Sequence, residues 1–248
     1  MARVKRTRKG QLLLLLCFLL ALAIFMAAFI LSTYGTLPRH IPITDPAFVL
    51  ASIRDSAKRT VDLATANLSW SSAPSEDVIR FWLDQWVNNT ATLWMQRGVF
   101  IRVVYVIESW GVPWRSTDQN PATTFVRVRF IANITSSDFE IYDNFLVTSY
   151  MNLSVVELPD LRYPGDNFTI KVTGIRDIAW GAGPAANLTI LQILCQGFPS
   201  YPLHIRDLGN GTYIIVCSWP SAASDPPYPI EVLAQDQRAI LCRAVFPV

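Results

Sequence analysis

A ten-residue stretch decides the fold: Asp207-Leu208-Gly209-Asn210-Gly211-Thr212-Tyr213-Ile214-Ile215-Val216. Its two glycines favour a tight turn, because glycine adopts a positive φ without the steric cost that other residues meet. The β-branched residues after the turn are typical of a strand, and Tyr213 would anchor the start of that strand. The stretch therefore predicts a turn that leads directly into a strand of a β-domain.

The same stretch resembles the Asp-x-Gly-x-Gly-x-Tyr signature of immunoglobulin-like repeats in surface proteins and filamins. Trp219-Pro220 and the segment from Tyr228 to Val232 are similar to the next strand of such modules. The resemblance implies an immunoglobulin-like β-sandwich over residues 159–248, although a fold by itself does not identify a ligand. Turn residues separate the strands that we expect there, which are Phe168–Gly174, Asn187–Cys195, Tyr213–Trp219, Ile230–Ala234 and Ile240–Phe246.

Residues 45–158, which precede this module, begin with two predicted helices. Asp45 can cap the first helix, and Pro46 suits its first position because that position needs no N–H donor. The second helix is expected after Pro74, with Ser75 as its cap. Apolar residues at helical spacing predict the two buried faces, which are Leu50, Ile53, Ala57, Val61 and Ala64, and Ile79, Trp82, Leu83, Trp86 and Leu93.

Strands follow these helices, because the hydrophobic pattern changes to alternation at Val99–Ser109, Thr123–Ile134 and Phe145–Leu158. Ser136–Asn144 is polar and predicts a loop. We interpret residues 45–158 as an extracytoplasmic region of helices packed on an antiparallel sheet. The predicted fold class is therefore α+β: an N-terminal transmembrane helix, helices packed on an antiparallel sheet, and then an all-β immunoglobulin-like sandwich.

The N-terminal segment predicts a membrane anchor. Five positive residues precede Leu12–Leu31, which runs for 20 residues without a charge. At about 1.5 Å per residue, such a helix spans the hydrocarbon core of roughly 30 Å. Positive residues before a span keep the N-terminus in the cytoplasm. We expect a cytoplasmic segment at 1–10, a single transmembrane helix at 11–32, a connector at 33–44 and an extracytoplasmic bulk at the cell membrane.

The junction Arg8-Lys9-Gly10-Gln11 resembles the class III signal of archaeal type IV pilins and pilin-like proteins. That resemblance implies cleavage after Gly10, with Gln11 as the new N-terminus and the apolar helix retained. It covers only residues 5–35, and the large outer part departs from major pilins. A minor pilin-like component therefore fits better than a bulk filament subunit, and an uncleaved signal anchor remains an equal alternative.

The outer part also carries many candidate glycosylation sites. Seven of the ten asparagines lie in Asn-x-Ser/Thr sequons, all after the apolar run. Their density favours a glycosylated surface, although these residue types are also common in turns and strands. The sequon asparagines are Asn67, Asn88, Asn133, Asn152, Asn167, Asn187 and Asn210.

The cysteines of the terminal module are candidates for a disulfide, because such bonds persist outside the cell. Three cysteines lie there, so one bridge leaves one thiol over. We predict a bond between Cys195 and Cys217, and the alternative is three buried apolar residues. Their spacing does not match a zinc site, and no cofactor or metal is expected.

Charge and motifs favour binding over catalysis. Five of the 21 Lys and Arg residues precede the apolar run. The part of the chain after that run has the other 16 and all 19 acidic residues, which gives it a net charge of −3. A nucleic-acid partner is therefore not expected. Only two histidines occur, His40 in the connector and His204 on an expected strand, and no motif of a catalytic triad, zinc protease or phosphate loop is present. An enzyme is not predicted.

These features predict a membrane-anchored extracytoplasmic protein with a structural, adhesive or assembly role, including that of a minor pilin-like component. Its expected partners are the lipid bilayer, surface glycans, and other proteins or further copies that bind through the transmembrane and juxtamembrane helices. The alternative is an accessory or solute-binding subunit of a membrane complex, which would dock through the stripe from Leu50 to Ala64. A hydrolase with unidentified carboxylates is the third hypothesis.

Overall fold

The computed structural model describes residues 45–112, 120–158, 167–178, 181–185, 187–218, 220 and 229–246. Residues Ile43–Val248 form one compact unit. The predicted cytoplasmic segment, transmembrane helix and connector, with the candidate processing site at Gly10 and Gln11, lie outside the described residues. No helix of the described ranges is both long and apolar enough to cross a membrane.

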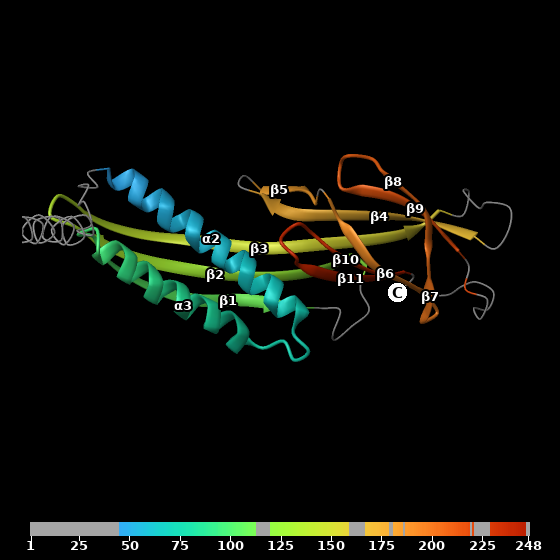
Figure 1. Cartoon of the computed structure of the whole chain (residues 1–248), viewed down its shortest axis with the longest axis horizontal. Coiled ribbons are helices and arrows are strands. Elements are labelled where there is room, and N and C mark those ends of the chain that lie inside the picture. The colour runs from blue at the N-terminus through green and yellow to red at the C-terminus, as the bar shows by residue number, and fades with distance from the viewer. Residues whose placement is uncertain are drawn as a thin grey trace, which may run out of the picture. The chain divides into compact units, whose positions relative to one another are not determined.

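The described part is mostly strand, with two helices and antiparallel sheets, which confirms the predicted order of helices followed by antiparallel strands (Figure 1). The helices are α2 (Pro46–Trp70) and α3 (Glu76–Met95). The strands are β1 (Phe100–Gly111), β2 (Ala122–Thr135), β3 (Glu140–Glu157), β4 (Asn167–Ile178), β5 (Gly181–Pro184), β6 (Thr189–Cys195), β7 (Phe198–Ser200), β8 (Pro202–Asp207), β9 (Thr212–Ser218), β10 (Ile230–Gln235) and β11 (Leu241–Phe246).

Both helices begin where the sequence predicts. The Asp45 carboxylate accepts a hydrogen bond from the N–H of Ala47 at 2.9 Å, and Pro46 occupies the first turn of α2. Ser75 is the N-cap residue of α3, but its side chain makes no capping hydrogen bond. Glu76 and Asp77 in the first turn of α3 lie where the helix dipole favours negative charge.

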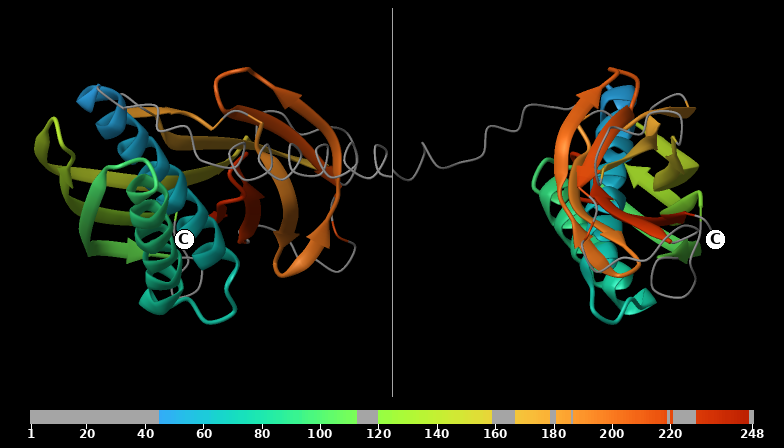
Figure 2. Two further views of the ribbon diagram at one scale, coloured as in Figure 1. Left: turned by 60° about the vertical axis from the view of Figure 1, so that its left-hand side comes forward. Right: turned by 90° about the vertical axis from the view of Figure 1, so that its right-hand side faces the viewer.

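The two sheets are both antiparallel. The larger sheet has the order β1-β2-β3-β4-β9-β8, with β5 paired to β4. The smaller sheet has the order β11-β10-β6-β7. It faces the β4 and β9 side of the larger sheet across a shared core, whereas α2 and α3 lie side by side across β1, β2 and β3 (Figure 2).

Strand β3 belongs to both halves of the larger sheet. Its residues from Glu140 to Leu153 pair with β2, and those from Met151 to Glu157 pair with β4. The predicted regions 45–158 and 159–248 are therefore joined through one continuous sheet instead of being two separate bodies. The segment Ser136–Asn144, which we expected to be a loop, contains the first residues of β3 because the turn ends at Phe139.

Two hydrophobic clusters fill the unit. One combines buried side chains of both helices with those of β1 and β2, and Trp86 contacts the ring of Phe130 edge-on at 5.3 Å between centroids. The other lies between the two sheets and includes Ile215 and Val232. The predicted helical faces are buried except at Leu50 and Trp82, which are half-buried, and Leu93, which is exposed while Trp94 takes the buried place.

A network of charges links α2, the end of β4 and the turn between β10 and β11. Arg238 donates hydrogen bonds to Asp62 at 2.9 Å and to Asp177 at 2.8 Å. It also bonds Asp236, and Lys58 pairs with Asp62 at 2.6 Å. Burial acts to raise the pKa of Asp177, but Lys58, the N–H of Tyr150 and Arg238 outweigh it and hold that pKa below its usual value.

Candidate interaction surfaces and modification sites

The turn that decides the fold has the geometry that its glycines predict. Gly209 and Gly211 have φ of +77° and +75°. The Asp207 carboxylate accepts a hydrogen bond from the N–H of Gly209 at 2.7 Å. The hydroxyl of buried Tyr213 accepts one from the N–H of Leu188 at 3.0 Å, which ties β9 to the start of β6. Tyr213 therefore anchors the strand as predicted.

The sequon asparagines all reach the surface. Asn88, Asn133, Asn187 and Asn210 are exposed, and Asn67, Asn152 and Asn167 are half-buried. The seven sequons also differ in the exposure of their Ser or Thr, which lies two positions after the asparagine. This residue is buried in four sequons, where it is Ser69, Thr90, Thr169 or Thr212.

In the other three sequons the Ser or Thr is at least partly exposed. In one of these three, the asparagine side chain makes a hydrogen bond. The amide nitrogen of Asn152 donates to the Thr123 hydroxyl at 2.8 Å. Asn133 with Thr135, and Asn187 with Thr189, are exposed at both positions. These two sequons are therefore the most accessible sites for a glycosyltransferase.

The predicted Cys195–Cys217 bond is not formed, because the three cysteines of the described part are free and buried. Cys195 and Cys217 belong to different sheets, and both side chains contribute to the core between the sheets. Burial, together with the nearby Glu157, raises the pKa of Cys195 to about 11. Burial raises the pKa of Cys217 to about 12 against a hydrogen bond with Ser200, so both thiols are protonated at neutral pH and pack as small apolar groups.

Strand β8 forms one edge of the larger sheet, and all six of its residues are exposed. Leu203 and Ile205 are each 52 % exposed, and the pairing register with β9 shifts between Pro202 and His204. The N–H of Leu208 donates to the C=O of Thr212 on β9 at 2.9 Å. Because bonded and non-bonded pairs alternate along an antiparallel ladder, the backbone groups of Ile205 and Asp207 point to the free edge.

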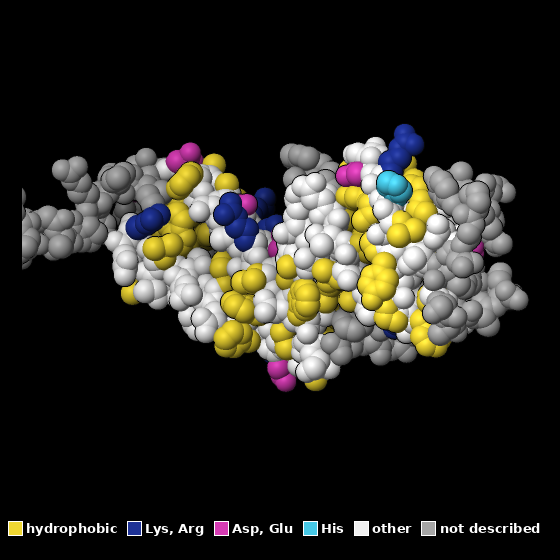
Figure 3. Space-filling model, turned by 45° about the vertical axis from the view of Figure 1, so that its right-hand side comes forward, with side chains coloured by type: hydrophobic (Ala, Val, Ile, Leu, Met, Phe, Trp, Pro, Cys, Tyr) yellow, Lys and Arg dark blue, Asp and Glu magenta, His cyan; other side chains and the backbone are white. Residues whose placement is uncertain are grey.

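Hydrophobic side chains gather at the end of the molecule that carries β7 and β8 (Figure 3). Besides Leu203 and Ile205, the exposed members are Phe198, Tyr201 and Leu208. An exposed apolar edge with unpaired backbone groups is a template for an additional strand. The sequence predicts a strand at His204 but does not indicate that this strand is an open edge. Its signal was the alternation of Leu203 and Ile205 with His204 and Arg206.

A second exposed surface is the outer face of β1, β2 and β3, which is the face away from the helices. Tyr105 bonds Asp84 of α3, so the alternate residues Phe100 and Val104 lie on the outer face. Asn133 and Tyr142 lie on the same face, directly opposite each other on β2 and β3. Toward the other end of β1, Glu108 pairs with Arg127 at 2.9 Å and with Arg129 at 2.6 Å.

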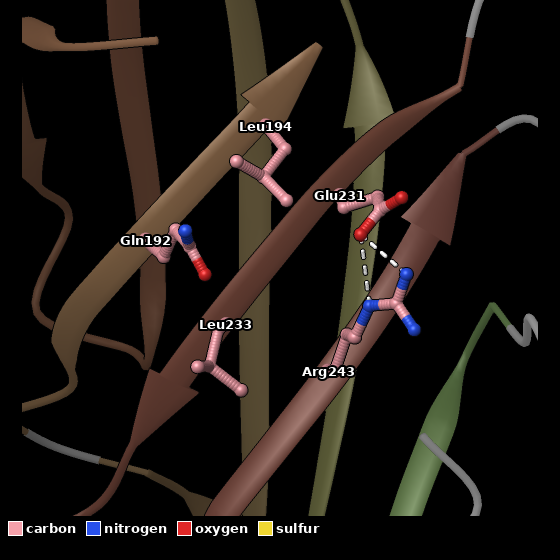
Figure 4. Close-up of a pocket in the computed structure, with 5 residues that line it drawn as sticks. All are labelled: Gln192, Leu194, Glu231, Leu233 and Arg243. Carbon is pink, nitrogen blue, oxygen red and sulfur yellow. Dashed lines mark hydrogen bonds and ion pairs between the residues drawn. The ribbon is translucent and has the colours of Figure 1, made fainter. Parts of the chain in front are cut away.

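The smaller sheet carries a shallow hollow of about 310 Å³ on the face that points away from the core (Figure 4). Gln192 and Leu194 of β6 and Leu233 of β10 line it. Glu231 of β10 and Arg243 of β11 complete it, and Arg243 Nε donates to the Glu231 carboxylate at 2.9 Å. Because this ion pair satisfies the charges internally, the hollow offers mainly two leucines and one amide to a ligand.

The apolar stripe of α2 is not an exposed docking surface. Ile53, Ala57, Val61 and Ala64 are fully buried in the protein's own core. Helix α2 therefore uses this stripe for folding.

No protein-family model, no curated protein and no solved structure matches this chain.

Proposed function

We propose that this chain is a single-pass, membrane-anchored extracytoplasmic protein with a structural, adhesive or assembly role. The basic head and the apolar run at 11–32 support the anchor, and the surface position of the sequon asparagines supports export. The tip is an immunoglobulin-like module that presents an open strand edge to a partner. Two forms of this function differ at Gly10, which is cleaved in a minor pilin-like component and intact in a permanently anchored protein.

The strand order supports the immunoglobulin-like assignment. Such sandwiches place strands A, B, E and D in one sheet and C, F and G in the other. The second half of β3, with β4, β9 and β8, has the order A-B-E-D. Strands β11, β10, β6 and β7 have the order G-F-C with one further strand. The Tyr213 motif then begins strand E.

The single observation that carries the assembly role is the exposed β8 edge. Native proteins usually cover or charge such an edge, because its unpaired N–H and C=O groups recruit other strands. In β8 the apolar Leu203 and Ile205 flank His204 at the middle of the strand, and both are half exposed. A partner strand would gain hydrogen bonds to Ile205 and Asp207 and bury both apolar side chains.

Substitution at this edge tests the assembly role in the native membrane. Ile205→Lys places a charge where the partner strand would pack, and Val104→Lys is a matched control on β1, the opposite edge of the same sheet. We expect cross-linking to yield a complex with the wild type and Val104→Lys, and loss of most of that complex with Ile205→Lys. Equal cross-linking in all three proteins would refute the role of β8.

The N-terminal residue decides between the two forms of this function. Mass spectrometry of the terminal peptide, from protein purified from its native membrane, would show Gln11 after pilin-type processing. The protein should then also be found in filaments. A start at Met1 or Ala2 would instead indicate a permanently anchored protein, including an accessory subunit with a fixed partner.

A further inference from the structure

The sequon at Asn133 lies among the exposed apolar residues of the outer face. Asn133 is directly opposite Tyr142 on β3 and Arg102 on β1. Its hydroxyl partner Thr135 is opposite Phe100. Tyr142 is 70 % exposed and Phe100 is 63 % exposed.

Distances in a sheet place these side chains within reach of a sugar on Asn133. Directly opposite residues have Cβ atoms about 4.5–5.5 Å apart, and diagonal neighbours are about 7–8 Å apart. Tyr142 is the direct neighbour of Asn133, and Phe100 and Val104 are its diagonal neighbours on β1. The C–H groups on one side of a pyranose ring are apolar, so they suit the face of an aromatic ring.

We propose that Asn133 carries an N-linked glycan whose first sugars lie on Tyr142 and Phe100 and cover the apolar end of the outer face. This inference rests on the proposed export of the chain. A sheet face with exposed aromatic residues is otherwise open to association. The occupant that we assign is a sugar because Asn133 lies between Arg102 and Tyr142 on that surface, and Asn133 and Thr135 are both exposed residues.

The modification needs a polyprenyl-phosphate-linked oligosaccharide and a membrane oligosaccharyltransferase. The amide nitrogen of Asn133 forms a bond to the anomeric carbon of the sugar. The bond between that carbon and the phosphate oxygen breaks, the lipid phosphate leaves, and the amide nitrogen loses one proton. The result is a neutral amide-linked glycan.

Asn187 provides the matched control. It and Thr189 are also exposed, but Asn187 lies in the turn before β6 and is not part of a strand face. Glycopeptide mass spectrometry of the full chain from its native membrane gives the occupancy of both sites. We expect both to be occupied. Occupancy of Asn187 without Asn133 would overturn this inference and leave the export intact, whereas two empty sites would overturn it and count against export.

A double-variant cycle tests whether the glycan lies on the aromatic residues. Tyr142→Ala should lower the unfolding midpoint of the glycosylated full chain in detergent by roughly 2–4 °C. The same substitution should have almost no effect in the Asn133→Gln background, but its full effect in the Asn187→Gln background. Equal effects of Tyr142→Ala in all three backgrounds would overturn the proposed contact, even with Asn133 occupied.

Discussion

Two glycines that lie two residues apart in the same turn share a positive φ but differ in their surroundings. Gly209 and Gly211 both have positive φ. A Cβ on Gly209 would meet nothing within 4 Å, whereas one on Gly211 would lie 2.6 Å from the carbonyl oxygen of Gly174. Gly211 therefore permits both the turn and the close approach of β4.

This contrast predicts unequal costs of substitution by alanine. Gly209→Ala should destabilise the fold by about 1 kcal/mol, the cost of a left-handed residue with a side chain. Gly211→Ala should cost about 3 kcal/mol, because backbone must also move to relieve the clash. Urea unfolding of the full chain in detergent measures both. Equal losses of unfolding free energy in the two variants would show that the backbone at Gly174 moves away from the added Cβ at no cost.

The Tyr213 hydroxyl gives a second prediction at this scale. Tyr213→Phe removes the acceptor of the buried Leu188 N–H and keeps the ring. We expect a loss of about 1–2 kcal/mol, since an unsatisfied buried donor retains its desolvation penalty. Tyr201→Phe, at an exposed tyrosine, is the control and should leave the unfolding midpoint unchanged. An unchanged midpoint for Tyr213→Phe would mean that water replaces the hydroxyl.

At the scale of elements, Trp86 is a buried aromatic anchor of α3. Trp86 is buried and contacts Phe130 of β2, whereas Phe81 on the same helix is exposed. Trp86→Ala should cost about 3–5 kcal/mol through loss of burial and the cavity that remains. Phe81→Ala should change stability by less than about 0.5 kcal/mol. Thermal unfolding followed by circular dichroism compares them, and similar midpoints would contradict the assigned anchor.

Elements with a one-sided hydrophobic pattern could be predicted from the sequence. The apolar stripe of α2, the alternation in β2 and the glycine turn before β9 could be predicted because in each the order of residue types follows from the local backbone geometry. β5 and β7 could not be predicted, because Gly181–Pro184 and Phe198–Ser200 are short and rich in glycine or proline. A strand was predicted at His204, but β8 exposes both faces, so it lacks the buried side that would have indicated its bounds.

The candidate sites could likewise be predicted only where they depend on neighbouring residues. Sequons are local motifs that the sequence shows directly, but the exposure of the Ser or Thr in each sequon depends on the fold. Cys195 and Cys217 are free and face the shared core from different sheets, an arrangement that sequence order does not show. The grouping of Phe100, Asn133 and Tyr142 depends on strand register, which joins residues far apart in sequence.

At the scale of the whole described unit, the Arg238 network joins the helices to the sandwich. Its residues come from α2, the end of β4 and the turn after β10. A carboxylate whose folded pKa is lowered contributes stability that is present above its unfolded pKa. That stability is lost as the pH falls through the folded value. Asp177 is such a group.

Asp177→Asn should therefore act in two ways. At pH 7 it should destabilise the full chain in detergent by about 2 kcal/mol, because Lys58 and Arg238 lose a charged partner. Below about pH 4 the variant should lose less stability on acidification than the wild type does. Asp55→Asn, at an exposed pair with Arg59, is the control and should leave the pH profile unchanged. Parallel acid-unfolding curves for Asp177→Asn and wild type would rule out this role.

The shared strand β3 limits how this protein can be divided and recombined. In many multidomain proteins a linker separates complete modules, so that a break in the linker leaves two foldable pieces. Here a break after Glu157 would deprive β4 of its neighbour, and a break before Met151 would shorten the partner of β2. The two-sheet part can therefore be transferred to another protein only together with β3, so the helices and the sheets belong to a single unit.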